Sequence, residues 1–115
     1  MSFIDANVIV CSSVNDPRSE EATIAILGGG FTNTLALAEA HRAILKITKI
    51  RKAADAAVLR IQKQLEIVPV TIDDISEAAK HTEIDIFDAI HIVTAQGAEF
   101  VTYDKELKAY AKKTR

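Results

Sequence analysis

Four carboxylates lie in stretches of this sequence that otherwise have the character of a protein interior. Asp5 and Asp88 each interrupt a run rich in Ile, Val and Ala. Glu39 lies among Leu and Ala residues, and Asp104 ends a short apolar run. Removing an ionised carboxylate from water costs several kcal/mol unless the group is paired or bound to a metal. Four like charges can meet only around cations, so the pattern predicts a metal site made of oxygen ligands.

The composition is typical of one folded domain over residues 1–115. Hydrophobic residues make up 49% of the chain and charged residues 26%. No apolar run is long enough to span a membrane, and the N-terminus lacks the pattern of a signal peptide. The single cysteine, Cys11, cannot form an internal disulfide and fits a reducing compartment. We therefore expect a cytoplasmic protein with no membrane segment.

The net charge of −2 hides an uneven distribution. Residues 42–63 carry seven basic side chains and one acid, a net +6, and residues 105–115 carry a net +4. The rest of the chain then carries −12. Basic helices beside an acidic remainder suit a protein that holds a polyanion and offers it metal-binding carboxylates. Basic helix faces are also ordinary solvated surface, and the charge alone favours that simpler interpretation.

Hydrophobic periodicity predicts strands that alternate with helices. Short apolar runs predict buried strands at 2–10, 67–70 and 99–102. Helices are predicted at 17–27, before the glycines 28–30, then through 35–45, at 50–64, from Thr71, from Glu83 or Asp85 to Gly97, and from Asp104. Thr32, Asn33 or Thr34 is expected to cap the second helix, and Thr71 to form a capping box with Asp74. The alternation predicts a three-layer α/β/α fold with a central parallel sheet.

In such a sheet, ligands bind at the carboxyl ends of the strands, near the point where the strand order reverses. Asp5 is predicted within the first strand and Asp104 just after the last, while Glu39 and Asp88 are predicted on helices. These positions allow all four acids to reach one cleft. Oxygen ligands favour Mg²⁺ or Mn²⁺. Ions held in this way activate a water and stabilise an in-line phosphoryl displacement.

The segments around these acids resemble the signature segments of the PIN-domain nucleases. They are Asp5-Ala6-Asn7, Leu37-Ala38-Glu39-Ala40, Phe87-Asp88-Ala89-Ile90-His91 and Val101-Thr102-Tyr103-Asp104-Lys105. The chain length and the closing Thr-x-Asp resemble the small prokaryotic members, the VapC toxins of toxin–antitoxin pairs. The resemblance implies a compact α/β fold and a Mg²⁺- or Mn²⁺-dependent endoribonuclease. It also implies a homodimer, an RNA substrate and a small antitoxin whose tail fills the active site.

The resemblance also implies roles for individual residues. The family's acidic quartet matches Asp5, Glu39, Asp88 and Asp104. We assign metal binding to the three aspartates, and to Glu39 either metal binding or orientation of the attacking water. Asn7 and Thr102 match the neighbouring polar positions, with Thr102 supporting Asp104 or a water. Asp85 is a candidate supporting ligand, although a helix N-cap is the favoured interpretation.

Each acid has a local explanation as well. Asp5 and Asp104 are possible helix or turn caps, Glu39 a partner for Arg42, and Asp88 a partner for His91. His91 and His41 are interpreted as packing or surface residues, since Asp88-x-x-His91 lacks the second acid–His pair that a di-iron bundle needs. The triple glycine lacks the ending and the preceding strand of a phosphate-binding loop.

Two other functions fit the same sequence. One is a nuclease of the same fold with a housekeeping role in RNA maturation or decay. Its sequence features are the same as those of a toxin. The other is a catalytically silent α/β module that holds nucleic acid or protein through its basic helices, with steep salt dependence and no need for metal.

Overall fold

The computed structural model describes residues 1–114, which form a central parallel sheet covered by helices on both faces. Within these residues the strands are β1 (Ser2–Ile4), β2 (Phe31–Asn33), β3 (Glu66–Val68) and β4 (Glu99–Val101). The helices are α1 (Ala6–Ser13), α2 (Ser19–Leu27), α3 (Thr34–Thr48), α4 (Arg51–Gln64), α5 (Ile72–Ala78), α6 (Ile86–Ala95) and α7 (Lys105–Thr114). Among residues 1–114, no helix has the length and apolarity needed to cross a bilayer.

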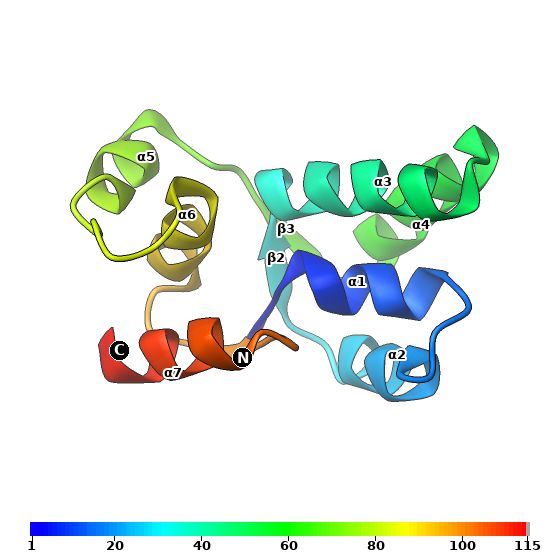
Figure 1. The fold of residues 1–115 in the computed structure, drawn as a ribbon, viewed down its shortest axis with the longest axis horizontal. Coiled ribbons are helices and arrows are strands. Elements are labelled where there is room, and N and C mark those ends of the chain that lie inside the picture. Colours follow the sequence, from blue (N-terminus) through cyan, green and yellow to red (C-terminus); the bar gives the residue numbers. More distant parts are fainter. Residues whose placement is uncertain (115) are drawn as a thin grey trace.

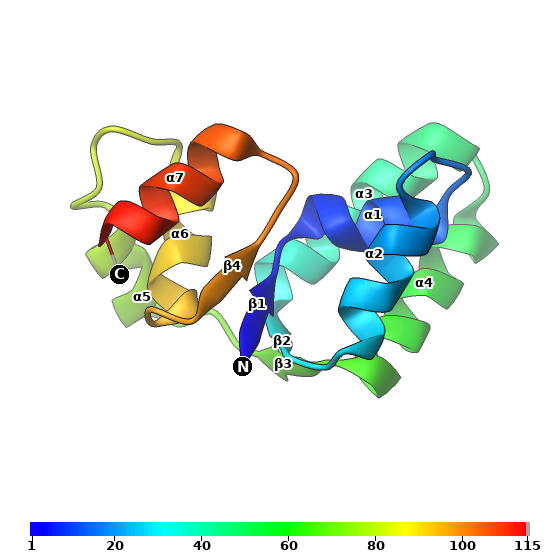
Figure 2. The same cartoon turned by 90° about the horizontal axis from the view of Figure 1, so that it is seen from below.

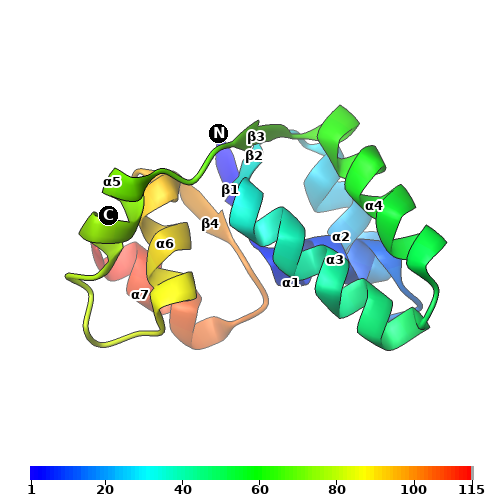
Figure 3. The same ribbon diagram turned by 90° about the horizontal axis from the view of Figure 1, so that it is seen from above.

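The elements form three layers. Helices α1 to α4 lie on one side of the sheet, and α5, α6 and α7 lie on the other (Figure 1). The views from below and above show the same separation, with the strands between the two groups of helices (Figures 2 and 3). The predicted three-layer α/β/α fold with a central parallel sheet is therefore confirmed.

The strand order β3-β2-β1-β4 places the first strand inside the sheet. The chain moves outward from β1 to β2 and β3, and then returns to add β4 on the opposite side of β1 (Figure 2). The order therefore reverses between β1 and β4. In open parallel sheets the crevice outside the carboxyl ends at such a reversal is where ligands bind.

Strand β1 supplies a side chain to the apolar core on each face of the sheet. Successive residues of a strand point to opposite faces. Phe3 packs with Phe100 and Leu107 on the side of α6 and α7, whereas Ile4 packs with Val8 and Ile61 on the side of α1 and α4. Both β1 side chains are fully buried. The two cores fix the orientation of β1 and hence the direction of the chain beyond Ile4.

The prediction of one strand over residues 2–10 is wrong. The strand ends at Ile4, and Ala6–Ser13 forms helix α1, whose N-cap is Asp5. Val8, Ile9 and Cys11 of this helix are buried. A short apolar run has the same composition whether it forms a buried strand or a buried helix, so its periodicity does not separate the two. Asp5 therefore lies at a strand-to-helix junction, not within a strand.

The sequence does not predict strand β2, because Thr32 and Asn33 are interpreted as candidate caps of the following helix. Phe31 pairs with Phe3 of β1, and Asn33 both ends the strand and caps α3. Gly30 precedes β2 with φ of 137°, and a Cβ on it would lie 2.4 Å from the Ser2 carbonyl oxygen. Only glycine fits this close approach of two backbones without a shift.

Most other element predictions are confirmed to within a few residues. Helix α4 matches the helix predicted at 50–64, and the short strands β3 and β4 lie at the predicted positions. Thr71 and Asp74 form the predicted capping box, with each side chain bonded to the other's backbone N–H. Asp85 caps α6, and α6 ends before Gly97. These boundaries depend on local capping chemistry, which the sequence displays directly.

Candidate active site

The four carboxylates meet at the carboxyl edge of the sheet. Asp5, Glu39, Asp88 and Asp104 all line one pocket of about 450 Å³. Asp5 comes directly after β1, and Asp104 comes three residues after the end of β4. These two acids therefore lie on either side of the reversal in strand order. The other two come from α3 and α6, which lie on opposite faces of the sheet (Figure 3).

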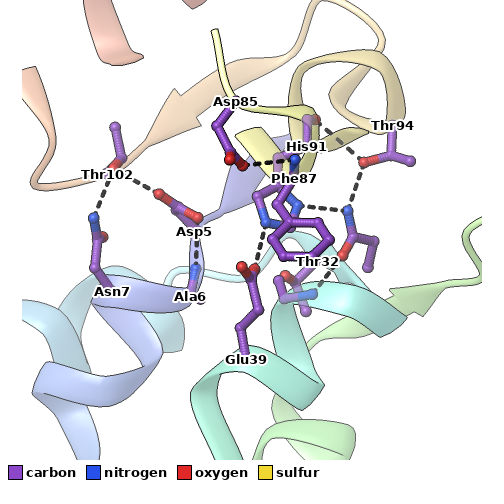
Figure 4. Close-up of polar contacts among 12 residues, drawn as sticks. Asp5, Ala6, Asn7, Thr32, Glu39, Asp85, Phe87, His91, Thr94 and Thr102 are labelled. Carbon is purple, nitrogen blue, oxygen red and sulfur yellow. Dashed lines mark hydrogen bonds and ion pairs between the residues drawn. The ribbon is translucent and has the colours of Figure 1, made fainter. Parts of the chain in front are cut away.

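Asp5 is held by both of its carboxylate oxygens. Oδ1 accepts a hydrogen bond of 2.8 Å from the backbone N–H of Ala6, and this bond caps α1. Oδ2 accepts a bond of 2.8 Å from the Thr102 hydroxyl across the reversal (Figure 4). Asp5 is 6% exposed. Its carboxylate is therefore fixed in direction at the end of β1.

Thr102 and Asn7 join the loop after β4 to the start of α1. The Thr102 hydroxyl accepts hydrogen bonds from the Asn7 amide, at 2.9 Å, and from the backbone N–H of Asp104, at 3.1 Å. The Asn7 side-chain oxygen accepts from the backbone N–H of Tyr103 at 3.1 Å. Thr102 thus contacts the Asp5 carboxylate and the Asp104 backbone, and Asn7 holds Thr102 in place. These bonds tie the two strand-end acids to each other.

Glu39 is bonded to a histidine that was predicted to be a packing or surface residue. The Nε2 atom of His91 lies 2.6 Å from Oε1 of Glu39 (Figure 4). The His91 ring is 1% exposed, whereas the Glu39 side chain is 33% exposed and reaches the pocket. His91 lines the pocket as well, three residues after Asp88 on the same helix face.

Asp88 and Asp104 both lie at the beginning of a helix. Asp88 is in the first turn of α6, where free backbone N–H groups favour a negative charge. Asp104 accepts a 3.0 Å hydrogen bond from the backbone N–H of Leu107 and so caps α7, as predicted. Asp85 accepts a 2.8 Å bond from the N–H of Phe87 and is the N-cap of α6, outside the pocket lining.

The pocket raises the pKa of two of its acids. Burial is the main cause for Asp5, and the hydrogen bond from Thr102 opposes it without reversing it. Burial also raises the pKa of Asp88, and the charges of Asp5 and Asp85 raise it further. Within residues 1–114, Asp5, Asp88 and Asp104 form no salt bridge. When these aspartates are ionised, no salt bridge within the described residues neutralises their charge.

The residues fit a hydrated hard cation. Their donors toward the pocket are carboxylate oxygens, the ligand type that Mg²⁺ prefers, and burial together with repulsion from nearby acids raises the pKa of Asp88. In the described chain, no three Asp, Glu, His or Cys side chains are arranged to hold an ion together. Mg²⁺ usually keeps several of its waters and takes only one or two protein carboxylates directly. Four carboxylates that line one pocket without forming such a group suit that mode of binding.

The local explanations for the acids are only partly correct. Asp5 and Asp104 are helix caps, and each also lines the pocket. In the described chain, Glu39 is paired with His91 and not with Arg42, so neither predicted ion pair along a helix forms. Sequence reasoning missed Asn33, whose amide nitrogen lies 2.9 Å from Nδ1 of His91. The three-residue spacing from Asp88 was the one available sign that His91 faces the pocket.

Comparisons with known proteins agree with the fold. The structure is similar to that of VapC20 from Mycobacterium tuberculosis, described as a Sarcin-Ricin loop cleaving toxin, with a TM-score of 0.82 and 18% identity over 96% of this chain and 95% of that one. It is also similar to VapBC2 from Rickettsia felis bound to a DNA fragment from their promoter, with a TM-score of 0.71 and 19% identity over 94% and 91% of the two chains. A protein from Pyrobaculum aerophilum gives a TM-score of 0.70 and 18% identity over 96% and 84%.

Sequence comparison identifies the family. No curated protein matches the chain significantly. The family model of the PIN domain matches residues 2–113, which include all four acids of the pocket. The chain therefore belongs to the PIN-domain family.

Proposed function

We propose that this protein is a Mg²⁺- or Mn²⁺-dependent endoribonuclease and the toxin of a type II toxin–antitoxin pair. The observation that carries the proposal is the convergence of four carboxylates, from four separate segments of the chain, on one pocket at the reversal of strand order. Grouping such charges does not stabilise the fold, because each ionised carboxylate makes the others harder to ionise. A bound cation would offset this repulsion.

Asp5, Asp88 and Asp104 are the residues that would hold the metal, in part through its bound waters. Asp5 and Asp104 are both fixed by hydrogen bonds that involve Thr102, so their positions are set before any ligand arrives. A bound divalent ion supplies Lewis acidity, which lowers the pKa of a coordinated water and offsets charge on a phosphoryl group. The protein's part is to keep the aspartates aligned and to place the scissile phosphate against them.

Glu39 is suited to orient the attacking water. One of its oxygens, Oε1, is engaged by His91, and the half-exposed carboxylate faces the pocket that the aspartates line. The second oxygen is then available to accept a hydrogen bond from water and to take up its proton. Attack of the water oxygen on phosphorus breaks a phosphodiester bond, and the leaving oxygen is protonated by solvent.

An RNA substrate agrees with the charge distribution. The basic residues of 42–63 lie mainly on α3 and α4, and those of 105–114 lie on α7, which begins at the pocket beside Asp104. Such basic surfaces attract the phosphate backbone of a nucleic acid. The structurally similar VapC20 is named as a Sarcin-Ricin loop cleaving toxin, and this supports RNA as the polymer.

The partners we propose are a small antitoxin protein and a second copy of this chain. Similarity to the VapBC2 proteins of Rickettsia felis supports the first. The family resemblance supports the homodimer and a cytoplasmic location. An antitoxin gene beside the gene for this protein would distinguish the toxin from a housekeeping nuclease of RNA maturation.

The test is cleavage of a pool of structured RNAs by the purified protein with Mg²⁺, with Mn²⁺ and with EDTA. We expect metal-dependent cutting that EDTA abolishes and that the substitution Asp5→Asn eliminates. Asp55→Asn is the matched control, because Asp55 is an exposed carboxylate outside the pocket that binds Arg51 and His41.

Undiminished metal-dependent cutting by the Asp5→Asn variant would refute the site assignment. No cutting under any condition, together with no binding of metal, would refute the nuclease. Salt-sensitive binding of RNA without metal would then favour the silent binding module.

A further inference from the structure

His91 is a buried histidine with both ring nitrogens engaged. Nδ1 lies 2.9 Å from the side-chain nitrogen of Asn33, and Nε2 lies 2.6 Å from Oε1 of Glu39. The ring packs against Phe3, with the two ring centroids 5.7 Å apart. It is 1% exposed, so neither nitrogen can exchange these partners for water. The three polar side chains therefore form a line from β2 through α6 to α3.

The orientation of the Asn33 amide is fixed by its other contacts. Its oxygen accepts a 2.7 Å hydrogen bond from the backbone N–H of Ala36, which makes Asn33 the N-cap of α3. Its nitrogen must then point the other way, where it also donates a 2.8 Å bond to the Thr94 hydroxyl. Thr94 in turn donates to the backbone carbonyl of His91 at 3.2 Å. An inverted amide would break the helix cap.

This orientation determines which nitrogen of His91 carries the proton. The amide nitrogen of Asn33 is only a donor, so Nδ1 of His91 must accept. Nε2 then carries the hydrogen and donates it to Glu39. The opposite tautomer would place two donors together at Nδ1 and two acceptors together at Nε2, and buried unmatched groups of this kind are costly.

We propose that Asn33 and His91 are positioning residues that fix Glu39 in the direction it needs to serve the pocket. Asn33 sets the tautomer of His91. His91 in turn binds Oε1 of Glu39, so that Oε2 is turned toward the part of the pocket that the three aspartates line. The proposal rests on the proposed function, because it assigns Glu39 a task in the nuclease site. Groups that orient metal-site residues from behind typically contribute about 10–100-fold to metal affinity or activity.

A purely structural role explains these residues poorly. Capping α3 requires only the side-chain oxygen of Asn33, and Ser or Asp caps a helix as well. Packing against Phe3 requires only a flat or apolar ring at position 91. Neither task requires a donor aimed at a half-exposed carboxylate. The line of hydrogen bonds ends at Glu39, a residue of the pocket, and this is the feature that points to the site.

The first test is the tautomer of His91 in the metal-free full-length protein. Nitrogen-15 NMR of labelled histidine rings separates a protonated ring nitrogen from an accepting one. We expect His91 to carry its proton on Nε2, with its signal identified by its loss in the variant His91→Gln. A proton on Nδ1, or rapid exchange between the two forms, overturns the proposal whether or not the protein is a nuclease.

The second test compares three variants with the wild-type protein. Asn33→Ser retains a helix cap but removes the donor to Nδ1, and His91→Leu removes the donor to Glu39. His91→Gln keeps an N–H donor near the position of Nε2. The matched control is His41→Leu, since His41 binds the exposed Asp55 at a similar distance of 2.7 Å but lies outside the pocket. Thermal melting of each variant identifies those that fold.

We expect Asn33→Ser and His91→Leu to lower kcat for RNA cleavage by about 10–100-fold, with a smaller change in KM. His91→Gln should restore a large part of kcat, and His41→Leu should resemble the wild type.

If the wild type binds Mn²⁺ and cuts RNA while the folded Asn33→Ser and His91→Leu variants do so equally well, the positioning role is refuted and the nuclease stands. If the wild type neither binds nor cuts, the proposed function fails and the positioning role fails with it.

Discussion

Two histidine–carboxylate pairs of nearly equal length lie in two very different regions of this molecule. His91 and Glu39 are 2.6 Å apart at the pocket, and His41 and Asp55 are 2.7 Å apart between α3 and α4. The His91 side chain is 1% exposed, whereas the His41 side chain is 23% exposed and that of Asp55 51%. Within residues 1–114, a second buried donor, Asn33, continues the His91–Glu39 pair and none continues the other. The distance between the atoms is therefore a poor guide to what a pair does.

The acids of the two regions also differ in their pKa. The hydrogen bonds from His41 and Arg51 lower the pKa of Asp55, so its charge is stabilised within the protein. Burial raises the pKa of Asp5 and Asp88, and no basic side chain of the described chain forms a salt bridge with either. Asp55 is neutralised by His41 and Arg51, whereas Asp5 and Asp88 form no salt bridge within residues 1–114. We therefore expect a cation site at the pocket and not around Asp55.

The largest expected effect comes from neutralising Glu39, and the same change at Asp55 is its control. Glu39→Gln keeps an oxygen for His91 but removes the charge and the base at the pocket, so we expect RNA cleavage to fall by about a hundredfold or more. Asp55→Asn should leave the cleavage rate unchanged within about twofold. Initial rates at saturating Mg²⁺ measure both variants. A similar loss in the two variants would show that the pairs are equivalent and that our distinction is wrong.

A second comparison uses two helix caps. Asn33→Ala removes the cap of α3 and also leaves Nδ1 of the buried His91 without a donor, so we expect roughly 2–4 kcal/mol of destabilisation. Thr71→Ala removes an exposed cap of α5 and should cost only about 1 kcal/mol. Urea denaturation measures both free energies of unfolding. Equal losses would mean that the contact between Asn33 and His91 contributes nothing beyond the cap.

A smaller effect of opposite sign is expected for Asp88. Its ionised form is disfavoured by burial and by the charges of Asp5 and Asp85, so Asp88→Asn should raise the melting temperature of the metal-free protein by about 2–4 °C. Asp55→Asn removes a carboxylate whose ionised form the protein stabilises, so this substitution should lower the melting temperature. Melting in EDTA provides the test. Destabilisation by Asp88→Asn would show that the pocket is not under electrostatic strain.

The dependence of stability on pH should follow the same division. The raised pKa of Asp5 and Asp88 means that the folded state holds protons that the unfolded state has released, from about pH 4 upward. Stability of the metal-free protein should therefore fall as the pH rises through the pKa values of these acids in the folded state. Asp55 has a lowered pKa and contributes stability that is lost only as the pH falls below 3.8.

Urea denaturation between pH 4 and pH 7 measures this slope, and Asp88→Asn should flatten it. An identical slope in the variant would contradict the assignment of the slope to Asp88. Saturating Mg²⁺ should also reduce the slope if the ion binds the ionised acids.

The parts of the site that the sequence predicts are those governed by local chemistry. Asp104 and Asp85 follow the rules for helix caps, and both cap helices in the structure. The alternation of strands and helices predicts a parallel sheet, and a parallel sheet brings Asp5 and Asp104 to one edge. Their convergence on a pocket with Glu39 and Asp88 was therefore predictable, whereas their binding of metal stays a prediction.

The parts that the sequence did not predict depend on contacts across the fold. The sequence predicts a strand through residues 6–10, because buried helices and buried strands have the same apolar composition, and only the capping bond of Asp5 marks the boundary. The pairing of His91 with Glu39 joins residues 52 positions apart, and Asn33 lies 58 positions from His91. No local pattern encodes these contacts, since they arise only when α3 and α6 pack around β2.

Calorimetric titration of Mn²⁺ into the metal-free protein tests most directly the claim that the pocket is built to hold a cation. The account predicts binding by the wild type and by Asp55→Asn, and loss of that binding in Asp5→Asn and in Asp88→Asn. Equal binding by all four proteins, or no binding by the wild type, would contradict it.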